Sequence, residues 1–348
     1  ADQGIIGAGL LEAPLNYIKE AGVDYELISD LAAEPTCDQA QDVVNEFRNK
    51  GCDFIVAVGG GSVMDTAKLC SILATDEYQV RDLLDNPKLA KKCVKSLMIP
   101  TTAGTGAEAT PNAIVAVPEK ELKVGIVNDE MIPDYVILDG EMIKNLPRKI
   151  AASTGIDAMA HAIECFTSNK ANPFSDTFAL KAFDLIINNI EAACDDKTAD
   201  DARNNMLIAA FYAGVAITAS GTTAVHALSY PLGGKYHIPH GVSNAIMLAP
   251  VMKFNEPVVR EKFAAAYDRV NHNGDASLSV EEKSAWVLDR MCSIIKHLDI
   301  PTSLKEYGVS KDDLDFLVTA GMDVQRLLVN NMRKVTAEDA RALYLEIL

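Results

Sequence analysis

The chain has 348 residues, of which 49% are hydrophobic and 23% charged, and its formal net charge is −17. This length favours two globular domains, and the acidic balance argues against nucleic acid or an anionic membrane as a partner, because both attract basic surfaces. The seven cysteines are scattered without a CxxC pair, no apolar run approaches the ~20 residues of a membrane span, and no secretory signal opens the chain. We therefore expect a reduced, cytoplasmic protein.

The first part of the chain alternates short apolar runs with helical patterns. The pattern predicts buried strands at 24–28, 54–58, 96–99 and 135–138, helices at 10–19, 40–50 and 62–73, and a hairpin formed by 115–118 and 123–127. Such alternation indicates parallel strands joined by crossover helices. Residues 1–9 read as a loop and turn, so the opening strand of a doubly wound domain is either missing from this sequence or replaced in an atypical domain.

The pattern changes after Pro147, where candidate strands all but disappear. Long segments rich in Ala and Leu follow, such as 176–194 and 203–219. The sequence therefore predicts an N-terminal α/β domain over 1–147 and an all-α domain over 148–348.

Two loops of small residues follow predicted strands directly. Gly59–Ser62 lies between a strand and a helix, where glycine lets backbone N–H groups approach a phosphate and the helix dipole favours an anion. Pro100–Glu108 is a second such loop, rich in hydroxyl groups. Ligands of open α/β sheets bind at the carboxyl ends of strands, so the pair favours a dinucleotide site over two tight structural turns.

Four side chains with metal-binding chemistry stand at two places in the helical part. Asp157 and His161 are four residues apart, on one face of a predicted helix, and the stretch from His226 to His240 holds three of the six histidines. Three imidazoles and one carboxylate suit a divalent first-row metal. The alternative is a set of hydrogen-bonded core histidines, and spacing alone does not decide between the two.

Five stretches resemble the iron-containing (group III) alcohol dehydrogenases. They are GGGSVMDTAK (59–68), PTTAGTGAEAT (100–110), ILDGEMIKNLP (137–147), TGIDAMAHAIE (154–164) and HALSYPLGGKYHIPHGVSNAI (226–246). The resemblance covers essentially the whole chain. It implies the dehydroquinate synthase-like fold of that family, in which a dinucleotide-binding α/β domain precedes an all-α domain and a catalytic metal lies in the cleft between them.

The resemblance also implies roles for individual residues. Asp157, His161, His226 and His240 would bind Fe²⁺, or Zn²⁺ as in some members. The residues that would bind NAD or NADP are Gly60, Gly61, Ser62, Asp65, Thr101, Thr102, Thr105, Lys123 and Met142. A homodimer acting on a small alcohol or aldehyde is the family habit, and Asn112 could face that substrate, although a capping or turn role for it is an equal alternative.

The sequence departs from the family at three places. Many members carry a second histidine four residues after the third ligand, where this chain has Tyr230; His237 could partly replace it as a proton relay, or be an ordinary loop residue. An Asp often contacts the ribose just before Pro35, and here Ser29 stands there, next to Asp30, which leaves NADP(H) possible. The third departure is that the family's opening strand and its loop have no counterpart in this sequence.

The predicted activity is reversible hydride transfer between a nicotinamide cofactor and a small alcohol or aldehyde, with the metal polarising the substrate oxygen. Two alternatives remain. One is a metal- and NAD-using lyase of the dehydroquinate synthase type, although the segment 226–240 is poor in the basic residues that its substrate needs. The other is a relative that kept the fold and lost the chemistry.

Overall fold

The computed structural model describes residues 1–120 and 122–348, which form two compact units. The first unit comprises Ala1–Thr102 and Ala107–Ile143, and the second comprises Ala103–Gly106 and Lys144–Leu348. The first is α/β with a parallel sheet and the second is built from helices, so the predicted fold class is confirmed. The domain boundary after Pro147 stays a prediction.

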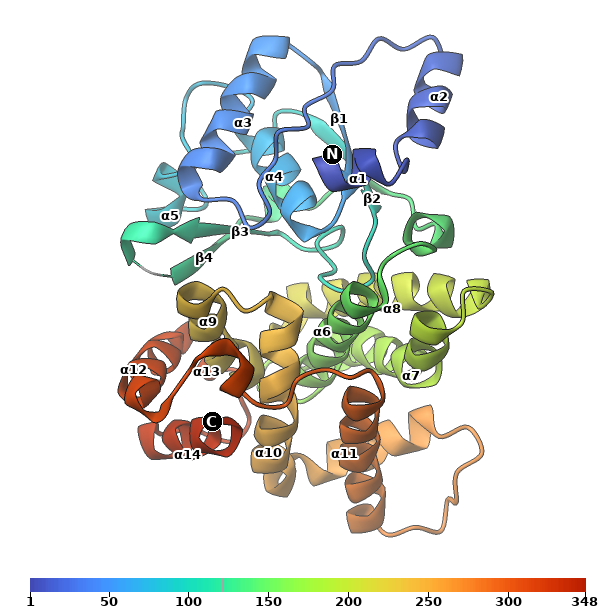
Figure 1. Ribbon diagram of the computed structural model, residues 1–348, viewed down its shortest axis with the longest axis vertical. Helices are drawn as coiled ribbons and strands as arrows, with labels where there is room; N and C mark the ends of the chain where they lie inside the picture. The colour runs from blue at the N-terminus through green and yellow to red at the C-terminus, as the bar shows by residue number, and fades with distance from the viewer. Residues whose placement is uncertain (121) are drawn as a thin grey trace. The chain divides into compact units, whose positions relative to one another are not determined.

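The first unit contains a small parallel sheet, a hairpin and short helices (Figure 1). In chain order its elements are α1 (Gln3–Gly7), α2 (Glu12–Glu20), α3 (Cys37–Lys50), β1 (Phe54–Gly59), α4 (Gly61–Ile72), α5 (Asp82–Asp85), β2 (Lys95–Pro100), β3 (Asn112–Val117), β4 (Leu122–Val127) and β5 (Tyr135–Val136). The sheet has the order β1-β2-β5 and all its pairs are parallel, while β3 and β4 pair antiparallel. Three predicted strands and the hairpin are thereby confirmed.

Local sequence signals fix the helices around this sheet. Thr36 and Gln39 form a capping box at the start of α3, and Gly51 ends the helix in the left-handed conformation at φ 64°. Buried side chains of α3, α4 and β3 share one hydrophobic cluster, so the helices cover the strands with their apolar faces. This packing holds the start of α4 at the carboxyl end of β1.

The predicted strand at 24–28 is wrong. This segment has no strand in the structure, and Tyr25 and Leu27 are exposed. Leu27 and Ile28 line a cavity of about 120 Å³ together with Ile55 of β1, and in the described part of the chain β1 pairs with β2 alone. Apolar side chains alone predicted the strand, but a strand also needs a neighbour for its backbone hydrogen bonds.

The second unit consists of helices. They are α6 (Arg148–Phe166), α7 (Pro173–Asp195), α8 (Asp200–Ser220), α9 (Ala224–Tyr236), α10 (His240–Val270), α11 (Val280–His297), α12 (Leu314–Asp323), α13 (Gln325–Leu328) and α14 (Ala337–Ile347). The segments predicted at 176–194 and 203–219 correspond to α7 and α8, which pack side by side along α6. Within the described part of the chain, no single helix is long and apolar enough to span a membrane, and one bent pair, α8 with α9, meets the length and composition requirements.

The helix α6 lies in the middle of this unit. Every residue from Gly155 to Phe166 is buried, including the alanines that separate the polar ones. Small residues let the neighbouring helices approach: a Cβ at Gly155 would lie 2.8 Å from Ile190 of α7, and a Cβ at Gly241 of α10 would lie 2.3 Å from the Ser153 carbonyl oxygen. Polar side chains on α6 are therefore enclosed by α7, α8 and α10.

Candidate metal centre and cofactor loops

Two polar side chains of α6 are placed on one face by helix geometry. Asp157 and His161 are one turn apart, as predicted, and are 2% and 5% exposed. The Asp157 Oδ1 atom lies 3.8 Å from His161 Nε2. Burying a carboxylate and an imidazole inside an alanine-rich helix costs free energy unless both have partners.

The helices α9 and α10 deliver the other two side chains. His226 lies in the first turn of α9, and His240 is the first residue of α10. The chain between the two helices turns at His237, which adopts the left-handed conformation at φ 54°, and passes through Pro239 into α10. This turn brings two histidines fourteen positions apart in the sequence to one place.

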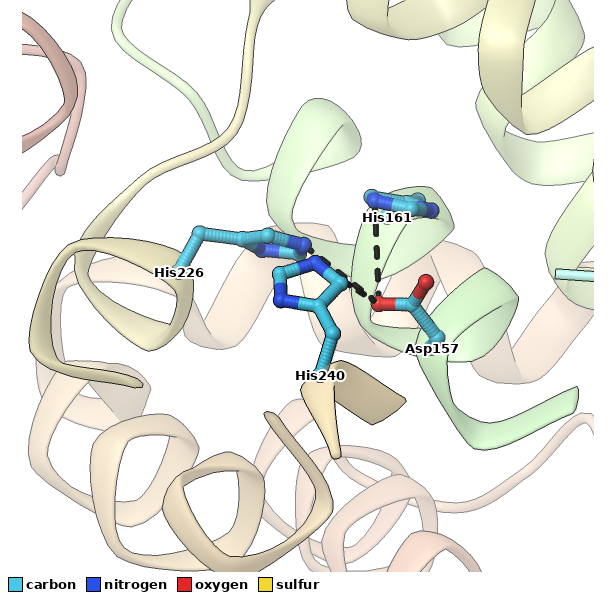
Figure 2. A group of neighbouring side chains, drawn as sticks. All are labelled: Asp157, His161, His226 and His240. Carbon is cyan, nitrogen blue, oxygen red and sulfur yellow. Dashed lines mark ion pairs between the residues drawn. The ribbon is translucent and has the colours of Figure 1, made fainter. Parts of the chain in front are cut away.

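Figure 2 shows the four side chains pointing toward one another. One oxygen atom, Asp157 Oδ1, lies 3.5 Å from His226 Nε2 and 3.7 Å from His240 Nε2. The four donor atoms all lie within 4.8 Å of one another. The rings of His161 and His226 stack with their centroids 4.6 Å apart. Three imidazole nitrogens and one carboxylate oxygen facing a common point form a donor set that fits a divalent first-row metal.

The close packing shifts the ionisation of these groups. Burial alone would raise the pKa of the Asp157 carboxyl, but the surrounding imidazoles lower it well below its usual range. Burial lowers the pKa of His161 to about 4. Burial would likewise lower the pKa of His226, but Glu164 and Asp157 outweigh it and raise this pKa to about 10. The Asp157 carboxyl is therefore ionised at neutral pH.

Glu164 is a site residue to which the sequence analysis assigned no role. One oxygen of its carboxylate contacts His226 Nδ1, and the other accepts hydrogen bonds from Thr223 N, Thr223 Oγ1 and Val225 N at 3.1, 2.7 and 2.8 Å. Glu164 thus caps the N-terminus of α9 and orients the ring of His226, leaving Nε2 toward Asp157. The sequence could have predicted that Glu164 lies near His161, because it follows His161 by three residues on the same face of α6.

The two predicted relay candidates lie in different surroundings. The Tyr230 ring centroid is 6.2 Å from that of His240, and its hydroxyl oxygen accepts a hydrogen bond of 3.2 Å from Arg326 Nη2. His237 is an exposed residue at the C-cap of α9, the loop position that the sequence left as its alternative. The relay role of either residue stays a prediction.

The first glycine loop lies beside the residues that follow β2. Gly59 pairs with Pro100, and Thr101 N donates a 3.0 Å hydrogen bond to the Gly59 carbonyl oxygen. A Cβ at Gly59 would lie 2.6 Å from the Val63 side chain, so packing requires glycine there. At Gly60 it would make an ordinary contact of 3.6 Å with Thr102, so packing does not require glycine at this position. Gly60, Gly61 and Ser62 are only half-buried, so the N-terminus of α4 stays accessible, as an anion site needs.

The other predicted cofactor residues have the following places. Ser62 Oγ accepts a hydrogen bond from Glu34 N at 3.1 Å, and the Glu34 carboxylate pairs with Lys123 Nζ at 2.7 Å. The Ser29 hydroxyl accepts one from Gln3 at 3.1 Å. Met142 packs against the hydrophobic cluster that contains Val58 and Ile99. Gly61 is the first residue of α4, and Asn112 is the first residue of β3. Thr102 is half-buried, and Thr105 belongs to the second unit. Their cofactor and substrate roles remain predictions.

A buried charge cluster holds α4 against β3. Lys68, fully buried, lies 2.9 Å from Asp65 Oδ1 and donates to the carbonyl oxygens of Thr110 and Asn112. Asp65 Oδ2 accepts a hydrogen bond from Ile114 N at 3.0 Å. These contacts give Asp65 a structural function besides its predicted one. They also fix the helix that carries the glycine loop.

Glu108 borders this cluster, and burial raises the pKa of its carboxyl to about 7. Because folding raises this pKa, the folded protein favours the protonated carboxyl. The resulting stabilisation is complete below the pKa of the unfolded chain, and it is lost as the pH rises through about 7, the pKa in the folded protein. We expect Glu108→Gln to raise the free energy of unfolding at pH 8 by on the order of 3 kcal/mol and to change little near pH 4.5. Urea unfolding at both pH values measures this. The exposed Glu20→Gln serves as control, and equal effects at the two pH values would contradict the prediction.

Known proteins of one family are similar to this chain in sequence and in structure. The iron-containing alcohol dehydrogenase model matches residues 1–140, and the C-terminal model of the same family matches 151–348. The chain is 31% identical to long-chain-alcohol dehydrogenase 1 of Geobacillus thermodenitrificans, over 99% of this chain and 87% of that protein. It is 32% identical to lactaldehyde reductase of Escherichia coli, over 99% and 89%. The structure of an alcohol dehydrogenase from Oenococcus oeni is 28% identical with a TM-score of 0.93, over 100% and 91%. With both units matched by its models, the chain belongs to the iron-containing alcohol dehydrogenase family.

Proposed function

We propose that this chain is a metal-dependent oxidoreductase that transfers a hydride between NAD(H) or NADP(H) and a small alcohol or aldehyde. The observation that carries the proposal is the convergence of Asp157, His161, His226 and His240, whose donor atoms lie within 4.8 Å of one another. This donor set fits Fe²⁺ or Zn²⁺, because imidazole nitrogens suit both metals. When bound, such a metal supplies Lewis-acid polarisation of the substrate oxygen.

The residues around the four donor side chains orient one of the histidine rings, exclude water and supply a hydroxyl group. Glu164 orients His226 through Nδ1, so that Nε2 points toward Asp157 and a bound metal would replace the proton on that nitrogen. The burial of Asp157 and His161 excludes water from their side of the site. Tyr230, beside His240, has a hydroxyl proton to donate and takes the place of the histidine found in many members.

The glycine loop supports the cofactor half of the proposal. The N-terminus of α4 is half-buried at Gly60 and Gly61, where backbone N–H groups and the helix dipole favour a pyrophosphate. Ser62 and Lys123 are joined through Glu34 close to that helix end. The nicotinamide supplies the hydride chemistry, and these residues would hold and orient the cofactor.

Ser29 is the residue that we expect to govern the choice between the two cofactors. It carries no charge that would repel a 2′-phosphate, and a carboxylate at this place would accept the ribose hydroxyl instead. We expect Ser29→Asp to lower kcat/KM for NADPH relative to NADH by about tenfold or more, equivalent to about 1.4 kcal/mol. Steady-state kinetics with both cofactors measure the ratio, with Ser29→Asn as the isosteric uncharged control. An unchanged ratio would remove Ser29 from the cofactor site.

The experiment that tests the proposed function is a cofactor and aldehyde panel after reconstitution with Fe²⁺ or Zn²⁺. The expected result is metal-dependent consumption of NADH or NADPH at 340 nm with small aldehydes. A lyase of the dehydroquinate synthase type would give no net change in absorbance, because it regenerates its cofactor. A chain that binds metal and cofactor without turnover on any aldehyde or alcohol would instead be a non-catalytic relative.

A further inference from the structure

Asn244 inserts its amide among the donor atoms of the proposed metal site. It lies on α10 one turn after His240 and is fully buried. Its Nδ2 atom is 2.6 Å from Asp157 Oδ1, 3.0 Å from His226 Nε2 and 3.2 Å from His240 Nε2. These are three of the four donor atoms that face one another. The amide nitrogen therefore borders the space in which the four side chains would hold a cation.

The other end of the same amide contacts a hydroxyl group that can serve it in two ways. Asn244 Oδ1 contacts Ser229 Oγ, and the same hydroxyl lies 3.0 Å from the carbonyl oxygen of His226. A hydroxyl has one hydrogen to donate and lone pairs to accept with. It either donates to Asn244 Oδ1, or it donates to the His226 carbonyl and accepts a hydrogen bond from the amide.

These two arrangements correspond to the two orientations of the amide. With Nδ2 toward the donor atoms, its two N–H groups can donate to Asp157 Oδ1 and to the lone pair of His240 Nε2. With the amide rotated by half a turn, Oδ1 faces the donor atoms and Nδ2 donates to Ser229 Oγ. Both orientations leave the buried amide hydrogen-bonded, so neither carries the cost of an unsatisfied polar group.

Charge decides between them. Lone pairs converging on one point attract the positive end of the amide, its N–H groups. A divalent cation takes up those lone pairs, repels the N–H groups and attracts the partial negative charge of the carbonyl oxygen.

We propose that Asn244 is a fifth ligand of the metal centre, whose amide turns over when the metal binds and presents Oδ1 to it, with Ser229 supporting both orientations. This inference rests on the proposed metal site and adds to it a residue outside the Asp-His-His-His set. It also predicts that residue 244 has different roles in the two states: its N–H groups donate hydrogen bonds in the metal-free protein, and its oxygen binds the metal when the metal is present.

The test compares full-length wild type with Asn244→Ala and Asn244→Asp, using Co²⁺ as the probe. We expect Asn244→Ala to weaken Co²⁺ binding by roughly ten- to a hundredfold and to change the position and intensity of the visible Co²⁺ bands, because a ligand is lost. Asn244→Asp keeps an oxygen but has no N–H group. It should retain Co²⁺ with at least wild-type affinity, yet lower the Tm of the metal-free protein.

A matched control is Asn255→Ala, which removes another buried asparagine of α10 that pairs with Asn331. It should lower the Tm and leave the Co²⁺ spectrum unchanged. If wild type binds one Co²⁺ per chain and Asn244→Ala gives the same spectrum and affinity, the inference is overturned and the metal site stands. If Asn244→Asp weakens Co²⁺ binding as much as Asn244→Ala, the amide acts as a donor only, and the rotation is wrong. If wild type binds no Co²⁺, the proposed function and the inference fall together.

Discussion

Asp157→Asn is expected to reduce metal affinity by at least about 100-fold, equivalent to about 2.7 kcal/mol, and to remove nearly all turnover. Asp157 is the one carboxylate in the set of four, and its Oδ1 lies within 3.8 Å of the Nε2 atoms of all three histidines. Asparagine keeps the shape of the side chain and removes its charge, so the site would hold a divalent ion with neutral ligands alone. Metal content after dialysis against a defined free-metal concentration measures the loss.

A matched control exists in the same unit. Asp184 is also buried and lies 2.7 Å from a histidine nitrogen, that of His272, outside the donor set. Asp184→Asn should affect stability and leave metal content unchanged. If Asp157→Asn retains stoichiometric metal and full turnover, the assignment of the site is wrong.

Glu164→Gln is expected to weaken metal binding by roughly ten- to a hundredfold, although residue 164 is not itself a proposed ligand. The Gln carbonyl oxygen can still accept the hydrogen bonds from Thr223 and Val225, which leaves its NH₂ group facing His226 Nδ1. Nδ1 then becomes an acceptor, and the ring proton moves to Nε2, the atom that faces Asp157. The imidazole would thus lose the lone pair with which it binds metal.

The measurement for Glu164→Gln is a metal titration followed by an indicator chelator, together with the pH profile of metal uptake. The control is Glu191→Gln, which breaks an ion pair with Arg290 in the same unit. Equal metal affinity of Glu164→Gln and wild type would show that Glu164 serves only to cap α9. A loss confined to Glu164→Gln supports its role in positioning His226.

The sequence predicted the elements with strong local signals. The i, i+4 spacing placed Asp157 and His161 on one face of α6, and the strand-loop-helix pattern placed Gly59–Ser62 at the start of α4. That His226 and His240 join them depends on the turn at His237, which spacing alone left undecided. The assignment of His226 and His240 to the metal site came from the resemblance to the family motifs.

Other features depend on tertiary contacts, and local patterns could not supply them. The segment 24–28 carries apolar residues like a strand, but none of the described strands pairs with it. Glu164 and Asn244 lie within the recognised motifs and follow a donor residue by three or four positions, yet a polar residue at that spacing is common in helices. Their importance appears only when the helices α6, α9 and α10 bring their side chains into contact.

The most direct test of the central claim joins metal content to hydride transfer in one preparation. Chelator-treated protein is titrated with Fe²⁺ without oxygen, or with Zn²⁺, and turnover of NADH or NADPH with a small aldehyde is followed at 340 nm. We expect turnover to rise in proportion to bound metal and to level off at one ion per chain, with no response in Asp157→Asn. Full turnover in protein that holds no metal would contradict the account.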